Sequence, residues 1–197
     1  MKDLKPGDLF FGLMEFLAFI VPGFFLTVTL PKIIEYAPLK SIDITGEKTT
    51  TFSWFAFVMI SYILGHFLHH ICAMILNPIY EVTYLKIKLK KHETFIVKSE
   101  EIIEEKLPLK TDSVKAAEAY LRINNPNVLP ELERHEANSK LFRSICLLSI
   151  YLCFILELNA TIFLIVISFL SFTKFANERW THRYLIYQFF LISVKVN

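Results

Sequence analysis

Cysteine is scarce in this chain of 197 residues, and so is glycine, with three and five copies respectively. The cysteines are odd in number, have no paired spacing and all lie inside apolar runs, where a thiol behaves as a small hydrophobic group. They are Cys72, Cys146 and Cys153. The sequence therefore predicts neither a disulfide framework nor a zinc site.

Motifs of the well-known enzyme classes are missing as well. The chain has no Gly-x-Ser-x-Gly, no Walker loop, no His-Glu-x-x-His and no Rossmann glycine pattern. An Arg-x(4 to 6)-His ribonuclease motif is also absent, because Arg179 lies too close to His182 and Arg134 directly precedes His135. We therefore expect a protein that is not an enzyme, without catalytic residues or cofactor. The net charge of +2 gives no direct evidence for nucleic-acid binding.

Apolar residues, by contrast, are abundant: 54% of the chain is hydrophobic, and the mean hydropathy is +0.45. A transmembrane helix needs about 20 mostly apolar residues to cross a hydrocarbon core about 30 Å thick. Residues 9–30 and 52–76 meet that length. A third apolar stretch, residues 141–173, is too long for one crossing and is interrupted by Glu157-Leu158-Asn159. It predicts a hairpin of two short spans.

The distribution of basic residues predicts an orientation, because positively charged loops remain on the cytoplasmic side. Four spans would leave three of the 21 basic residues outside, namely Lys32, Lys40 and Lys48. We therefore predict an all-α, multi-pass protein of the cell inner membrane with four transmembrane helices and both termini cytoplasmic. Its expected parts are an N-terminal tail with spans 1 and 2 (1–76), a cytoplasmic helical loop (77–140), a transmembrane hairpin (141–173) and a cytoplasmic or interfacial tail (174–197).

Four lysines follow the second span, which Asn77-Pro78 is expected to end. Residues 80–89 alternate basic and apolar side chains, which is typical of a short strand or of a basic helix on the lipid surface. Phosphate headgroups attract each such lysine by about 1 kcal/mol. The candidates for contact with headgroups or with a partner are Lys86, Lys88, Lys90 and Lys91. The alternative is that they are the ordinary positive charge that flanks a span on the cytoplasmic side.

Pro130 suits the first turn of a further helix, and Glu131 and Glu133 complement the positive end of its dipole. That helix could run through Leu141 directly into the third span. A continuous helix would couple the cytoplasmic loop mechanically to the membrane.

Three histidines lie in the second span, where ionisable groups are candidates for functional sites. Helical spacing puts His66 with His69 and His70 on one face. Two of them, with Glu15 or Glu81, could hold a metal ion. The alternative is that His66 hydrogen-bonds a neighbouring helix while the other two lie near the cytoplasmic headgroups.

The first span carries two further candidates for gating. Pro22-Gly23 removes one backbone donor and weakens the helix, so a kink is expected there, either for packing or as the hinge of a gate. Glu15 lies deep enough in the membrane to need a polar environment. It could line a cavity, pair with a histidine of the second span or contact a neighbouring protomer. Gly12, Gly23 and Gly65 allow helices to approach closely.

Short apolar strings carry a resemblance to a known family. Leu-Phe-Phe-Gly-Leu-x-Glu-Phe leads to Val-Pro-Gly-Phe-Phe in the first span, and Tyr-Ile-Leu-Gly-His-Phe-Leu-His lies in the second. With the basic insert and the final hairpin, the chain resembles the small four-span Csx-type membrane accessory proteins of type VI-B CRISPR loci, which act in phage defence. The resemblance implies a non-enzymatic protein that modulates an RNA-guided RNase and/or permeabilises the membrane as an oligomer. The implied partners are membrane lipids, further copies of the chain and a cytoplasmic RNA-guided RNase.

Two other functions remain open from the residues. One is a small channel or transporter component, with Glu15 and His66 lining a path. The other is a membrane metalloenzyme that uses the face formed by His66, His69 and His70.

Overall fold

The structure is a computed structural model that describes residues 6–33, 51–107, 112–156 and 158–196. These residues are helical, and no strand occurs among them, which confirms the predicted all-α class. The side chains of residues 6–15 lie outside the described part, so the candidate Glu15 and the small residue Gly12 do too.

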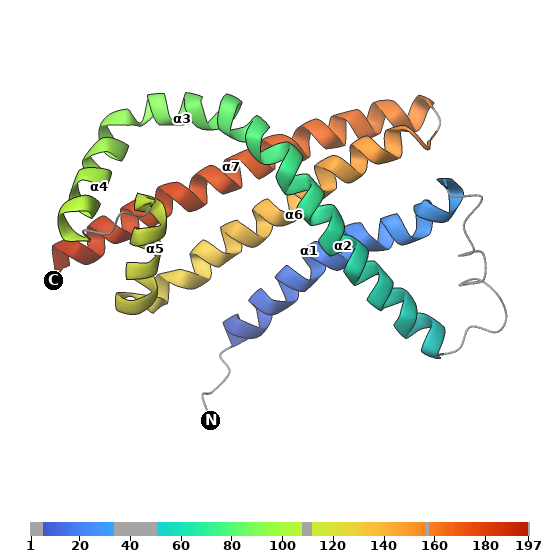
Figure 1. Cartoon of the computed structure of the whole chain (residues 1–197), viewed down its shortest axis with the longest axis horizontal. Helices are drawn as coiled ribbons and strands as arrows, with labels where there is room; N and C mark the ends of the chain where they lie inside the picture. The colour runs from blue at the N-terminus through green and yellow to red at the C-terminus, as the bar shows by residue number, and fades with distance from the viewer. Residues whose placement is uncertain (1–5, 34–50, 108–111, 157, 197) are drawn as a thin grey trace.

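The first two helices, α1 (Pro6–Ile33) and α2 (Thr51–Tyr80), cross each other (Figure 1). The helix does not end at Asn77-Pro78, where the sequence predicts the end of the second span: it passes Pro78 and continues through a π-helical turn, η2 (Glu81–Leu85), into α3 (Lys86–Lys91). A proline removes only its own amide donor, and the buried Leu76 and Tyr80 on either side of it belong to one cluster with Cys146 of α6 and Phe175 of α7. The lysine segment is thus helical and contains no strand.

Two short helices follow, α4 (Glu93–Lys106) and α5 (Ser113–Asn124), and the turn η3 (Pro126–Val128) leads on to the next helix. Asp112 is the N-cap of α5, since its side chain accepts a hydrogen bond of 3.0 Å from the amide of Val114. This satisfies one of the backbone donors that every helix start leaves without an intrahelical partner.

Changing Asp112 to alanine should lower the free energy of unfolding by about 1 kcal/mol, because that amide donor loses its partner. Chemical unfolding followed by circular dichroism measures the loss. Asp112→Asn should stay close to the wild type, since asparagine caps nearly as well. Equal losses for both variants would contradict the assignment of the cap.

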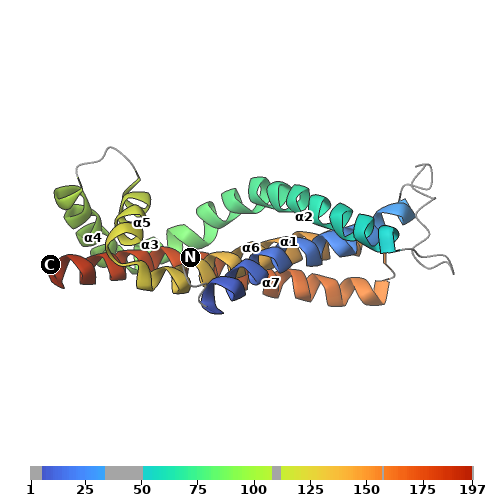
Figure 2. The same ribbon diagram turned by 90° about the horizontal axis from the view of Figure 1, so that it is seen from below.

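A long hairpin, α6 (Leu129–Cys153) and α7 (Leu158–Val196), forms the frame of the molecule, and its two helices lie side by side in both views (Figures 1 and 2). The described turn, residues 154–156, comes just before the break that the sequence predicts at Glu157-Leu158-Asn159, and Leu158 and Asn159 already belong to α7. In the predicted tail, the described residues 174–196 are helical and continue α7 as far as Val196. The 39 residues of α7 correspond to about 58 Å at 1.5 Å per residue, well beyond a hydrocarbon core of about 30 Å.

Two helical stretches, Ser53–Lys91 and Leu158–Lys195, are long and apolar enough to cross a membrane by length and composition, and Phe16–Thr29 is a shorter apolar helix. Only 22% and 17% of the most apolar windows of the two long stretches are buried inside the molecule. The core helix of a soluble protein would bury most of such a window. These helices therefore turn large apolar side chains outward, as Phe67 of α2 and Phe163 of α7 illustrate.

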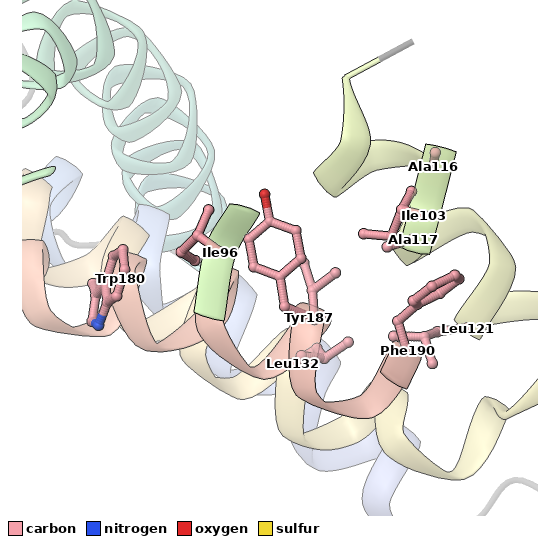
Figure 3. Packing of buried hydrophobic residues seen from close by; sticks show 10 residues of the cluster. Ile96, Ile103, Ala116, Ala117, Leu121, Leu132, Trp180, Tyr187 and Phe190 are labelled. Carbon is pink, nitrogen blue, oxygen red and sulfur yellow. The ribbon is translucent and has the colours of Figure 1, made fainter. Parts of the chain in front are cut away.

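A separate hydrophobic core lies at the far end of α7, where α4 and α5 pack against it (Figures 1 and 2). In Figure 3, Tyr187 and Phe190 of α7 lie beside Ile103 of α4 and Leu121 of α5. We call this end, made of α3, α4, α5, the start of α6 and residues 174–196, the head. The apolar helices α1 and α2 and the hairpin end of α6 and α7 form the apolar part.

Candidate functional site at the junction of head and apolar part

Two arginines from the hairpin meet one asparagine of α2 where the head joins the apolar part. Arg143 of α6 donates a hydrogen bond of 3.0 Å to the Oδ1 of Asn77. Arg179 of α7 donates to the same oxygen, also at 3.0 Å. Two guanidinium groups therefore share one neutral amide acceptor, which holds two positive charges close together.

A histidine completes the surroundings of Arg143. The Nη2 of Arg143 lies 2.7 Å from the Nε2 of His69. Because arginine can only donate, the imidazole of His69 accepts this hydrogen bond in its neutral form. The Arg143 side chain belongs to a residue only 6% exposed. Among the described residues, no carboxylate lies within ion-pair distance of Arg143 or Arg179. A buried cation without a counter-charge is expensive, which marks this cluster as unusual.

Tyr80 lies one helical turn after Asn77 and faces Arg179. The guanidinium carbon of Arg179 lies 5.4 Å from the centre of the Tyr80 ring, a cation–π geometry. Tyr80 is 2% exposed, and its hydroxyl has no hydrogen-bond partner among the described residues. The Nε atoms of Arg143 and Arg183 are also buried without a partner in that part of the chain. Native structures leave few such groups unsatisfied.

Tyr80 and the three arginines Arg143, Arg179 and Arg183 border one cavity of about 580 Å³ between η2, α5, α6 and α7. Its described lining includes six basic side chains, Lys115, Arg122, Lys140, Arg143, Arg179 and Arg183. It includes four acidic ones, Glu81, Asp112, Glu118 and Glu136. The cavity wall therefore carries an excess of positive charge.

Two of the acids are already engaged by bases on their own helices. Glu118 pairs with Arg122 at 2.8 Å on α5, and Glu136 pairs with Lys140 at 3.1 Å on α6. Burial alone would raise the pKa of Glu136, but Lys140, together with His182 and Arg122, outweighs that effect and holds the pKa below its usual value. The Glu136 carboxylate thus stays charged and paired with Lys140, and it does not neutralise Arg143 or Arg179.

The three predicted histidines do not share one environment. His66 stacks on Phe19 of α1 with ring centres 3.9 Å apart, and His69 meets the same ring edge-on at 5.0 Å while contacting Arg143. His70 is exposed. Within the described ranges, no group of three His, Cys, Asp or Glu side chains could hold a metal ion. His69 is the histidine that joins the junction cluster.

Pro22 and Gly23 lie where α1 crosses α2, in a helix that continues unbroken to Ile33. A Cβ added at Gly23 would lie 1.7 Å from the carbonyl oxygen of Ser61, and one at Gly65 would lie 2.0 Å from that of Phe19. The two glycines therefore let the backbones touch, as close helix packing in membranes requires. Gly23 therefore lies at the contact point between α1 and α2.

The predicted lysines line α3, on the side of the junction that leads into the head (Figure 1). Lys86, Lys90 and Lys91 are exposed, and the ammonium of Lys88 lies 5.3 Å from the centre of the Tyr84 ring. They are thus free to face headgroups or a partner surface.

Sequence reasoning missed the core of this site, namely Asn77, Tyr80, Arg143 and Arg179. One signal was available, because Arg143 is a charge inside the apolar stretch 141–173, and such charges are functional candidates.

A scan against models of known protein families, a search of curated proteins and a search of solved structures found no match to this chain.

Proposed function

We propose that this chain is a non-enzymatic accessory protein of the bacterial inner membrane that acts in antiviral defence. In this proposal it crosses the membrane four times, with both termini in the cytoplasm, and its cytoplasmic head receives a signal that changes the membrane part. The head would modulate an RNA-guided RNase, and an oligomer of the chain would permeabilise the membrane when triggered.

The observation that carries the proposal is the continuity of α7. Its first half exposes Phe163, Val166 and Leu170, while its second half buries Tyr187 and Phe190 in the head core. A single helix with apolar side chains facing outward at one end and a packed core at the other transmits a displacement from one end to the other. The charge distribution supports the orientation, and the resemblance in the first two spans supports the role in defence.

Bacteria that express an RNA-guided RNase with and without this chain provide the test. We expect the chain to change phage protection and to increase uptake of a membrane-impermeant dye after infection. Reversing the charge of three exposed lysines, Lys86, Lys90 and Lys91, to glutamate should reduce both effects.

The matched control is Lys98→Glu on α4, which is equally exposed but lies outside the lysine segment. It should keep both protection and dye uptake. If deletion of the chain alters neither readout, the proposed role is wrong.

A further inference from the structure

The junction cavity contains more hydrogen-bond donors than the described chain satisfies. Arg143 and Arg179 both depend on the single Oδ1 of Asn77, although each guanidinium carries five N–H groups. The other acceptor that the described residues offer to Arg143 is one ring nitrogen of His69, the Nε2 at 2.7 Å, because a neutral imidazole accepts at only one nitrogen. Among the described residues, no carboxylate is paired with Arg143 or Arg179.

The cavity's third arginine is also incompletely paired. Arg183 lies 4.0 Å from the nearest carboxylate oxygen, that of Glu100, at the limit of an ion pair. Its Nε is buried and has no partner among the described residues, like the Nε of Arg143 and the hydroxyl of Tyr80. Arg143 and Tyr80 are more than nine-tenths buried, so bulk water does not solvate these atoms freely.

We propose that this cavity binds the phosphate group of an anionic ligand, held by Arg143, Arg179 and Arg183 with the hydroxyl of Tyr80 as a further donor. Guanidinium groups match phosphate oxygens by paired hydrogen bonds, and they keep their charge when buried. A phosphate dianion also balances the excess of two basic over acidic side chains on the described wall. The site requires only this chemistry and does not depend on a role in defence.

The volume indicates that the ligand is larger than phosphate alone. A cavity of about 580 Å³ lies in the range of about 300 to 1,000 Å³ typical of small-molecule sites. The phosphate could belong to a soluble metabolite or to a lipid headgroup, because the cavity lies where α2 and α7 leave the apolar part. Both sources present the same group to the arginines.

The test uses the full chain in nanodiscs of phosphatidylcholine, whose zwitterionic headgroup is the reference. Inorganic pyrophosphate is titrated against a chloride control of equal ionic strength, and binding is measured by calorimetry. In a second arm, the nanodiscs contain phosphatidic acid, and the shift in melting temperature is measured. Saturable binding of pyrophosphate identifies a soluble ligand, and stabilisation by phosphatidic acid alone identifies a lipid headgroup.

Arg179→Gln should weaken binding of whichever probe binds, pyrophosphate or phosphatidic acid, by about tenfold or more, since a hydrogen bond to a charged group is lost. Arg134→Gln is the matched control, because Arg134 is exposed on α6 and does not line the cavity. It should bind like the wild type.

Asn77→Asp keeps the shape of the site and adds an internal anion between the two arginines. It should remain folded and lose affinity for the probe by at least tenfold, which separates ligand binding from simple loss of structure. If neither probe binds, or if Arg179→Gln and Arg134→Gln bind equally, the cavity is not a phosphate site.

Discussion

Changing Asn77 to leucine should destabilise the protein by about 3 kcal/mol, because the buried guanidinium of Arg143 and the partly buried one of Arg179 lose their shared acceptor. Each hydrogen bond to a charged group contributes about 1.5 to 3 kcal/mol, and an unpaired buried donor costs its full desolvation. Leucine has the same number and branching of side-chain heavy atoms as asparagine, which keeps the change in shape small. Chemical unfolding in detergent micelles gives the difference in free energy.

The matched control for this variant is Asn177→Leu. Asn177 is exposed, and its side-chain oxygen accepts one hydrogen bond of 3.3 Å from the hydroxyl of Tyr84. Its replacement should cost less than about 1 kcal/mol, because the lost bond is neutral and accessible to solvent. Equal costs for the two variants would show that the junction does not depend on Asn77.

Changing Gly65 to alanine should destabilise the protein more than any other addition of a single methyl group to α2. The new Cβ would lie 2.0 Å from the backbone oxygen of Phe19, and backbone atoms cannot rotate away as a flexible side chain does. The helices α1 and α2 must therefore separate, at a cost of about 3 kcal/mol, the upper part of the range for overpacking. Gly23→Ala should behave in the same way against Ser61.

Val21→Ile controls for the added carbon, since Val21 lies on α1 two residues before Gly23 but is exposed. Its unfolding free energy should stay within about 0.5 kcal/mol of the wild type, as is usual for surface changes. If Gly65→Ala is as mild as Val21→Ile, the close crossing of α1 and α2 is contradicted.

The helical class follows from local sequence, and so does the turn before Leu158, because both depend on patterns of neighbouring residues. The lengths of α2 and α7 do not follow from local sequence. Local signals end one helix at Pro78 and separate a tail after residue 173, yet α2 leads on to α3 and α7 reaches Val196. Packing of Tyr80 against Phe175 in one buried cluster outweighs those local signals.

The site was harder to predict for a different reason. Arg143 is 66 residues from Asn77, and Arg179 is 102 residues from it, so only the tertiary fold brings the three together. The histidines were visible as a motif, but nothing in their spacing indicates that His69 would meet an arginine of α6. The excess of donors in the cavity appears only once the helices are placed.

The most direct test of the whole account is a spin-label accessibility profile along α7 in liposomes. Labels at Ile162, Val166 and Leu170 should collide readily with oxygen, which dissolves in lipid, and poorly with a water-soluble nickel reagent. Labels at the exposed Lys174 and Asn177 should show the opposite preference, because the helix has then left the membrane. Equal access of the nickel reagent to both groups of positions would contradict a membrane-embedded first half of α7 joined to an aqueous head.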